Sequence, residues 1–343
     1  MRPLTTALLL LAAACSPGIT RHFYVHTDDG AELKVLLEGN LDSGVILLLL
    51  HGGPVGSAHV YNSGSYAEEL EARYAVAYLD QRGQGASQGR IDSREYTLQR
   101  AADDVDTVVD VLRGRYGEDV DIYLLGHSWG GMLGTLALLD TDASDDITGW
   151  AETAGCHDSL LEPRYVVSRM TEVGEAEVAA GREEARWGTI LSFVQAFDPE
   201  ATVFDDEDLY YLNQYGYEAE SLLDVITWED PIAADRFAGL RDPQRDGVAW
   251  WTASRELDVL YDEASTSGFT DRLGEIDVPG LYLYASYDFV CPAQLGRDAV
   301  AVNPHGESRY VELEHSGHSL MSNEPAAYVA AVEEFVEDTR GRR

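Results

Sequence analysis

The segment at residues 123–131 has the spacing expected of a serine nucleophile. An apolar run ends at Gly126, Ser128 follows two residues later, and Gly130 and Gly131 precede an apolar helical pattern. This Gly-x-Ser-x-Gly spacing is typical of a nucleophile elbow, in which a buried strand turns sharply into a helix and presents the serine hydroxyl at the tip. Glycine suits such a turn because the two backbones approach closely. We therefore interpret Ser128 as a candidate nucleophile.

A serine hydroxyl needs a neighbouring base to take its proton, and the base needs a third group to fix its tautomer. Downstream of Ser128, Asp288 follows one strand-like run and His318 follows the last one. We interpret these two as the acid and the base. Asp158, just beyond an earlier strand, is the alternative acid, and spacing alone does not exclude His315 as the base.

Two backbone N–H groups must also point at the charge that develops on the attacked carbonyl oxygen. Trp129, the residue after the nucleophile, is expected to supply one of them. The other is expected from the loop His-Gly-Gly-Pro at residues 51–54, with Gly53 as the donor. Trp129 and Gly53 are therefore the predicted oxyanion hole.

Alternating strand and helix patterns surround these residues. The apolar pattern predicts helices at 97–116, 129–139 and 326–335, and strands at 23–27, 33–38, 44–50, 74–79, 123–126, 147–153, 281–285 and 308–313. This alternation predicts an α/β fold with a mostly parallel eight-stranded sheet and helices on both faces. In such sheets functional side chains collect at the carboxyl ends of the strands, where the residues above lie.

Residues 156–272 differ in character from the rest of the chain. They are acidic, rich in Trp and Tyr, and mainly helical in pattern. We predict that they form a helical cap inserted between two parts of one core, residues 16–155 and residues 273–343.

The first 15 residues are typical of a secretion signal, with Arg2, an apolar stretch at 7–11 and small residues at 12–14. Cys15 directly after Ala14 resembles the bacterial lipoprotein signal, in which that cysteine is acylated. We therefore expect an exported protein, anchored by lipid at Cys15 on the periplasmic side or cell surface, with plain secretion as the alternative. A membrane contact is expected only through that anchor.

The charge balance excludes one class of partner. The chain has 24 Lys and Arg residues against 61 Asp and Glu residues, a formal net charge of −37. Because nucleic-acid binding depends on clustered positive side chains at the phosphates, we expect no nucleic-acid partner.

Five motifs in this order resemble one branch of the α/β-hydrolases. They are His-Gly-Gly-Pro (51–54), Asp-Gln-Arg-Gly-x-Gly-x-Ser (80–87), Gly-x-Ser-Trp-Gly (126–130), Tyr-Asp-Phe-Val-Cys-Pro (287–292) and Ser-Gly-His-Ser (316–319). The branch is that of the prolyl aminopeptidases, also called proline iminopeptidases. The resemblance implies the α/β-hydrolase fold, a triad of Ser128, Asp288 and His318, a small peptide substrate, and no metal or other cofactor.

The resemblance also implies how the substrate is read. The family binds the free amino terminus with glutamates of the cap, and the segments here that resemble theirs contain Glu229 and Glu256. The chain departs from the family at Val55, at residues 285–286, and at His127, where glycine is frequent. These departures bear on prolyl specificity more than on hydrolysis.

Two cysteines remain, Cys156 and Cys291, each just beyond a strand and near the predicted site. Cys291 belongs to the Asp-x-x-Cys-Pro motif, so no disulfide is needed to explain it. We expect two free thiols, with a disulfide between them as the alternative that export would permit.

Together these patterns predict a serine hydrolase that releases an N-terminal residue, preferably Pro, through an acyl-enzyme on Ser128. A carboxylesterase or amidase acting on a small exported substrate is the alternative within the same fold. A non-catalytic binding protein that uses the pocket as a receptor is the third interpretation.

Overall fold

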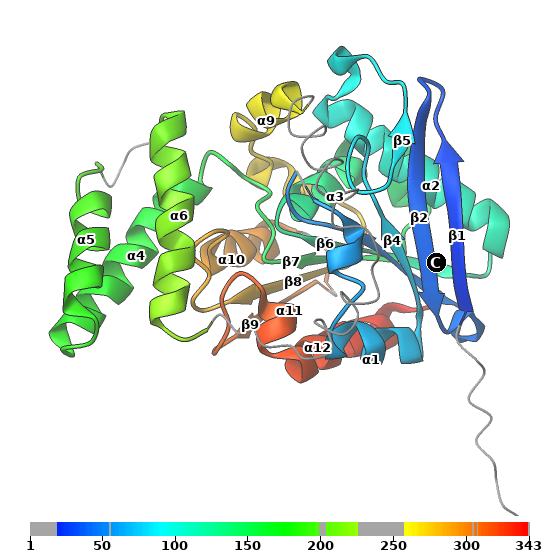
Figure 1. Cartoon of the computed structure of the whole chain (residues 1–343). Helices are drawn as coiled ribbons and strands as arrows, with labels where there is room; N and C mark the ends of the chain where they lie inside the picture. The colour runs from blue at the N-terminus through cyan, green and yellow to red at the C-terminus, as the bar shows by residue number, and fades with distance from the viewer. Residues whose placement is uncertain are drawn as a thin grey trace, which may run out of the picture.

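A single mixed sheet forms the centre of this computed structural model, which describes residues 19–54, 56–198, 204–225, 257–303, 305–306 and 308–341 (Figure 1). The strand order across the sheet is β1-β2-β4-β3-β6-β7-β8-β9, with β5 paired to β2. The strands are β1 Ile19–His26, β2 Ala31–Gly39, β3 Val45–Leu50, β4 Ala75–Leu79, β5 Gln88–Gly89, β6 Asp121–His127, β7 Gly149–Thr153, β8 Gly280–Ala285 and β9 Arg309–Leu313.

Strand direction agrees with the expected mostly parallel sheet. All pairings from β4 through β9 are parallel, whereas β1, β2 and β5 pair antiparallel at one edge. Within the described residues, the eight predicted strands are present and β5 is an addition. The two residues of β5 are exposed, so no apolar periodicity marks this strand in the sequence.

Burial on both faces explains the continuous apolar runs. All six residues of β3 are buried. Ile46, Leu48 and Leu50 join one core cluster, whereas Val45, Leu47 and Leu49 join the cluster on the opposite face. Successive side chains of a strand point to opposite faces, so a strand covered on both sides has no polar positions.

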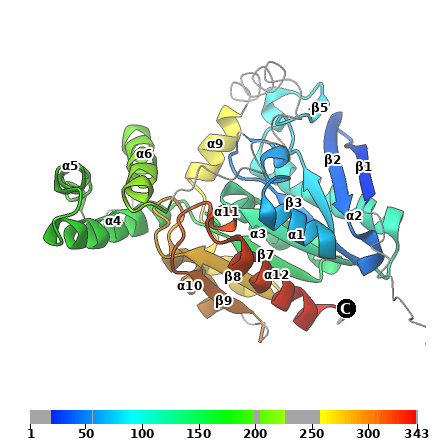
Figure 2. The same cartoon turned by 60° about the horizontal axis from the view of Figure 1, so that its bottom comes forward.

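Helices cover both faces of the sheet (Figure 2). The first face holds α2 Leu98–Tyr116, α3 Trp129–Asp140 and α10 Ala293–Val302, and the second holds α1 Ser65–Arg73, α11 Leu320–Asn323 and α12 Pro325–Thr339. Short 3-10 helices connect these elements: η1 Leu41–Ser43, η2 Ala58–Val60, η3 Ser93–Glu95, η4 Asp142–Asp145 and η5 Thr270–Glu275.

Three helices stand beside the sheet and have their own core (Figure 1). They are α4 Glu162–Ala179, α5 Glu184–Val194 and α6 Asp206–Leu222. Phe289, from the loop after β8, is fully buried in the same cluster. The chain returns through α9 Asp258–Ser265, whose residues Leu260 and Ala264 belong to the main core. The last part of the predicted cap, from residue 257 onward, therefore packs with the core. None of the described helices is long and apolar enough to cross a membrane.

Candidate active site

Ser128 lies at a strained turn between β6 and α3. Its backbone has φ 56° and ψ −124°, a conformation that side-chain-bearing residues rarely adopt. The turn brings strand and helix so close that a Cβ at Gly126 would clash with the carbonyl oxygen of Gly130. The structure thus has the nucleophile elbow expected from the sequence, with Ser128 on the wall of a cavity.

Asp288 and His318 meet at the carboxyl ends of β8 and β9. Their side chains are buried, and His318 Nδ1 lies 3.0 Å from Asp288 Oδ2. Asp288 Oδ1 accepts hydrogen bonds of 2.8 Å from the backbone N–H groups of Val290 and Cys291. Burial alone would lower the pKa of His318, but the charges of Asp288 and its carboxylate neighbours raise it above the usual range.

The alternative acid and base lie elsewhere. Asp158 Oδ1 accepts the backbone N–H groups of Leu160 and Leu161 at 3.1 and 3.0 Å, just before α4. His315 is exposed, and its backbone N–H donates to Glu324. Tertiary packing therefore brings His318, and not His315, to Asp288.

The serine and the histidine line the same cavity, but among the described residues no hydrogen bond joins them. The Ser128 hydroxyl lies 4.0 Å from Cys156 Sγ. The hydrogen bond between a catalytic serine and its base is often long in the absence of substrate and shortens when substrate binds.

The loop after β3 passes directly beside Ser128. The N–H of Gly52 donates to the Tyr61 hydroxyl at 2.9 Å, which leaves Gly53, with φ 146°, as the next amide on the cavity wall. Trp129 is the first residue of α3, where backbone N–H groups have no partner within the helix. Both predicted oxyanion donors therefore line the cavity beside Ser128.

The motif at residues 80–87 forms hydrogen bonds to the segments that carry these two predicted donors. Gln81 accepts a 2.7 Å hydrogen bond from the indole N–H of Trp129 and donates a 2.9 Å bond to the carbonyl of His51. Gln84 accepts the N–H of Gly56 at 3.1 Å. One short segment therefore links the β3 loop to the start of α3.

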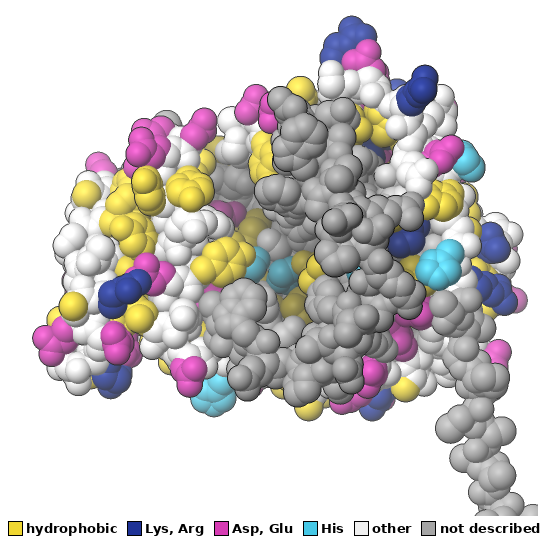
Figure 3. All heavy atoms as spheres, viewed as in Figure 1, with side chains coloured by type: hydrophobic (Ala, Val, Ile, Leu, Met, Phe, Trp, Pro, Cys, Tyr) yellow, Lys and Arg dark blue, Asp and Glu magenta, His cyan; other side chains and the backbone are white. Residues whose placement is uncertain are grey.

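A cavity of about 620 Å³ opens in front of Ser128. Its walls include the apolar side chains of Met132, Val166, Leu212 and Phe289. In the space-filling view, histidine side chains are visible at the base of a hollow beside α6 (Figure 3). The predicted amine-binding residues Glu229 and Glu256 lie outside the described residues, as do Val55 and Cys15.

Two carboxylates at this site were not found from the sequence. Glu162, in the first turn of α4, lines the cavity half-buried, and burial raises its pKa to about 8. Glu220 of α6 is buried against the loops of Asp288 and His318, and its Oε1 accepts the N–H of Phe289 at 3.4 Å. Both residues sit in an acidic insert where nothing in the sequence distinguishes them from solvated neighbours.

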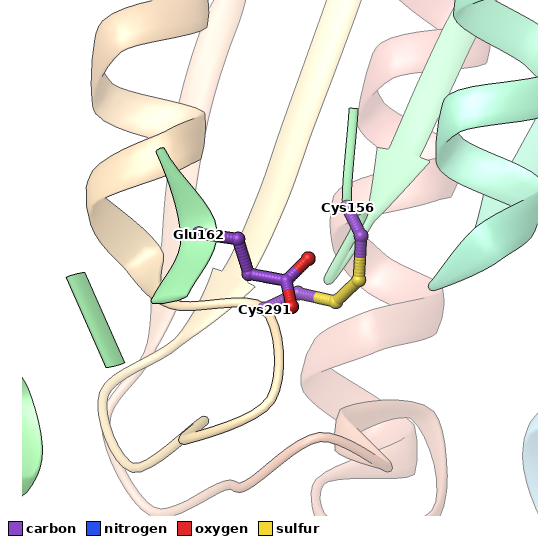
Figure 4. A group of neighbouring side chains, drawn as sticks. All are labelled: Cys156, Glu162 and Cys291. Atoms are coloured by element: carbon purple, nitrogen blue, oxygen red, sulfur yellow. A yellow bond between two sulfur atoms is a disulfide. The ribbon is translucent and has the colours of Figure 1, made fainter. Parts of the chain in front are cut away.

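Cys156 and Cys291 form a disulfide, so the preferred prediction of two free thiols is wrong. The carboxyl ends of neighbouring strands β7 and β8 bring the two Cα atoms within 5.2 Å. Figure 4 shows the Glu162 carboxylate beside the bonded sulfurs. The donor atoms of these three residues lie within 4.8 Å of one another, but sulfurs bonded to each other offer no thiolate ligand.

A mostly parallel sheet that presents a strained serine between β6 and α3 has the architecture of the α/β-hydrolases. Residues 47–332 match the model of the alpha/beta hydrolase family, and the chain belongs to this family.

Similarity to curated relatives covers most of the chain. The probable aminopeptidase YbaC of Bacillus subtilis (strain 168) is 25% identical over 297 residues, 82% of this chain and 86% of the relative. A proline iminopeptidase of Chitinophaga pinensis is 26% identical over 312 residues, 86% of this chain and 90% of the relative. These relatives confirm the resemblance to the prolyl aminopeptidase branch.

Solved structures confirm the fold. VinJ has a TM-score of 0.62 at 19% identity, covering 93% of this chain and 99% of that chain. A hydrolase from Pseudomonas aeruginosa PA01 has a TM-score of 0.56 at 21% identity, covering 92% of this chain and 98% of that chain.

Proposed function

We propose that this α/β-hydrolase is a serine aminopeptidase that releases an N-terminal residue, preferably Pro, from short peptides. The observation that carries the proposal is one cavity whose walls include the elbow serine Ser128, the base of an adjacent Asp–His pair and the carboxylate of Glu162. The names of the relatives, an aminopeptidase and a proline iminopeptidase, support the same activity.

In the proposed reaction, Ser128 Oγ attacks the scissile carbonyl and His318 takes the hydroxyl proton. The Trp129 and Gly53 amides stabilise the oxyanion, and Asp288 keeps His318 in the tautomer that accepts at Nε2. His318 then gives the proton to the leaving amine, and the N-terminal residue stays on Ser128 as an ester. Water activated by His318 hydrolyses that ester.

We propose that carboxylates bind the protonated amino terminus of the substrate. The resemblance assigns this role to Glu229 and Glu256, and Glu162 offers a third carboxylate on the cavity wall. Because burial raises the pKa of Glu162 to about 8, a bound ammonium group would favour its ionised form and gain a charge-assisted hydrogen bond. Apolar neighbours such as Val166 and Phe289 offer surface for a prolyl ring.

A panel of chromogenic aminoacyl amides tests the activity. We expect the prolyl amide to be cleaved with the highest kcat/KM, and Ser128→Ala to abolish cleavage. Glu162→Gln should raise KM for aminoacyl amides by about tenfold, the loss of one charge-assisted hydrogen bond of about 1.5 kcal/mol.

An acetyl ester without an amine serves as the matched substrate control. Its hydrolysis should be unchanged by Glu162→Gln, because it carries no ammonium group. An enzyme that hydrolyses the acetyl ester but none of the aminoacyl amides is an esterase, and this outcome contradicts the proposed aminopeptidase.

We also propose export and acylation at Cys15, as the sequence of residues 1–15 indicates. The mass of the mature chain tests this. An acylated N-terminus at Cys15 is expected, and an unmodified Cys15 would contradict the lipid anchor.

A further inference from the structure

Two side chains connect the oxyanion loop to the base. The Tyr61 hydroxyl, just after η2, accepts the N–H of Gly52 at 2.9 Å and lies 2.7 Å from His127 Nδ1. On the other side of the same ring, His127 Nε2 lies 2.8 Å from the carbonyl oxygen of His318. The contacts run from the β3 loop, through the residue before the nucleophile, to the loop after β9.

The partners fix the direction of each hydrogen bond. A carbonyl oxygen only accepts, so His127 Nε2 carries the hydrogen that points to His318. Burial lowers the pKa of His127 to about 3, so the ring is neutral and its Nδ1 accepts. The Tyr61 hydroxyl therefore donates to His127 while it accepts from Gly52. In this arrangement the Tyr61 hydroxyl and both ring nitrogens of His127 each have a hydrogen-bond partner.

The rings of Tyr61, His127 and His318 pack against one another. The ring centroids of His127 and His318 are 4.7 Å apart, and those of Tyr61 and His127 are 5.5 Å apart. A Cβ added at Gly52 would lie 2.8 Å from the Tyr61 hydroxyl and 3.1 Å from Ser128 Cβ. The β3 loop is thus wedged between Tyr61 and the nucleophile.

We propose that Tyr61 and His127 form a positioning bridge that holds the Gly53 amide and the His318 ring in register around Ser128. The bridge rests on the proposed roles of Ser128, His318 and Gly53. The residue at position 127 is often glycine in the family that this chain resembles, and glycine has no ring to make these contacts. A relative with glycine at this position therefore cannot form the bridge.

The bridge would affect the distances from Ser128 to the Gly53 amide and to the His318 ring, which must be short for catalysis. Gly52 precedes the proposed oxyanion donor, and the His318 carbonyl belongs to the residue that takes the serine proton. A shift of about 1 Å in such groups can lower the rate by about 100-fold. Tyr61 and His127 act through Gly52 and His318, so they position the site and make no contact with the reacting atoms.

Four variants divide the bridge into its parts. Tyr61→Phe removes only the hydroxyl, and His127→Gly removes both contacts of the ring. His127→Asn keeps an acceptor near the place of Nδ1, whereas His127→Gln keeps a donor near the place of Nε2. The assay is the second-order rate constant for labelling of Ser128 by a fluorophosphonate, in which the Ser128–phosphorus bond forms, fluoride leaves and His318 takes the proton.

We expect Tyr61→Phe to slow labelling by about tenfold, since it leaves a buried N–H and a ring nitrogen unpaired. His127→Gly should slow it by about 30- to 100-fold. His127→Asn and His127→Gln should each recover part of that loss. For an amide substrate that proves active, kcat should fall more than KM changes.

Non-additivity is the sharpest expectation. If the two side chains act as one unit, Tyr61→Phe should cost little further rate in a His127→Gly background. Losses that multiply in full would show that the two residues act separately and would overturn the bridge.

Tyr123→Phe is the matched control. Tyr123 is a buried tyrosine of β6 whose hydroxyl donates to the carbonyl of Val336, on the opposite side of the sheet from α3. The Tyr123→Phe variant should have a lower thermal stability and an unchanged labelling rate.

Two further outcomes would contradict the proposed bridge. Labelling rates in Tyr61→Phe and His127→Gly equal to that of the wild type, with reduced thermal stability, would reduce both residues to a packing role and overturn the proposal. A wild-type chain that reacts no faster than Ser128→Ala would instead contradict the proposed serine hydrolase itself, and the bridge with it.

Discussion

Asp288 is the residue on which the proposed base depends most directly. One of its oxygens accepts two backbone N–H groups, and the other faces His318 Nδ1 at 3.0 Å. Both oxygens must therefore act as acceptors at once, which a carboxylate does and an amide does not.

This requirement gives a prediction for Asp288→Asn. The amide oxygen would remain with the N–H groups of Val290 and Cys291, so the amide nitrogen would face His318 and force the wrong tautomer. We expect kcat to fall by about 10³- to 10⁴-fold with the fold retained. Steady-state kinetics with circular dichroism spectra of both proteins measures this.

Asp158→Asn is the control, because Asp158 bonds backbone N–H groups at the start of α4 and at Thr270. It should reduce thermal stability and change kcat by no more than about threefold, as expected for a residue that makes no contact with the base. A larger loss of kcat in Asp158→Asn than in Asp288→Asn would reverse the assignment of the acid.

At the scale of elements, the site is assembled from loops at the carboxyl ends of β3, β6, β7, β8 and β9. The disulfide joins two of them. The N–H of Cys156 donates to the Ser128 carbonyl at 3.2 Å, and the N–H of Cys291 donates to Asp288 at 2.8 Å. The cross-link therefore connects the backbone around Ser128, the proposed nucleophile, to the backbone around Asp288, the proposed acid.

Reduction of this disulfide by a phosphine should lower both activity and stability. The S–S bond breaks, water supplies the two thiol protons and the oxygen of the phosphine oxide, and two thiols form. We expect the free energy of unfolding to fall by about 2–4 kcal/mol, because the cross-link closes a long loop in the unfolded chain. Denaturant titrations of oxidised and reduced protein measure the change, and reoxidation should restore activity.

A Cys15→Ser variant provides a simple thiol count for the same prediction. Its oxidised form should show no free thiol under denaturing conditions, and its reduced form should show two. Two free thiols before reduction would contradict the disulfide, and full activity after reduction would contradict its role in holding the site.

Helix α6 shows how the insert reaches the proposed triad. Glu220 accepts the N–H of Phe289 from the loop of the acid, and the Tyr217 ring meets the His318 ring edge to face at 6.2 Å between centroids. The helices beside the sheet therefore contact both the acid loop and the base, and the position of α6 bears directly on the site.

At the scale of the whole molecule, acidic side chains dominate, with a formal net charge of −37. Carboxyl groups buried in such a chain are repelled by their neighbours as well as desolvated. Burial raises the pKa of Glu162 to about 8 and that of Glu220 to about 8, from an ordinary value of 4.5.

The consequence for stability follows from the sign of these shifts. A carboxyl group with a raised pKa binds its proton more tightly in the folded state than in the unfolded state. Its contribution to the free energy of unfolding is therefore fully present below pH 4.5 and is lost as the pH rises through about 8. His318 and His157 also have raised pKa values and act in the same direction above pH 6.5. His127 and His51, whose burial lowers their pKa values, oppose this trend only below pH 6.5.

We therefore predict that the free energy of unfolding falls between about pH 6.5 and pH 8.5. Each proton bound only in the folded state contributes a slope of at most about 1.4 kcal/mol per pH unit. Urea titrations at three pH values measure the slope, and Glu162→Gln should flatten it because the amide does not ionise. Stability that rises over this interval would contradict the assigned shifts.

The sequence by itself determined the features that depend on local order. Continuous apolar runs indicated strands buried on both faces, and the observed β3 and β6 are buried in this way. The spacing around Ser128 indicated the elbow, since a turn of that shape depends on the few residues that form it. The order of the five motifs indicated the α/β-hydrolase fold, which the family match confirms.

Only the tertiary structure decided which distant residues meet. His318 and His315 are equivalent by spacing, and burial against Asp288 separates them. Glu162 lines the cavity and Glu220 is buried beside Asp288 and His318 because of how α4 and α6 pack, and this depends on elements far away in the chain. The Cys156–Cys291 disulfide and the Tyr61–His127 bridge likewise arise where separate strands end at one edge of the sheet. Local sequence determines strands, helices and turns, whereas contacts between loops depend on how the whole sheet is assembled.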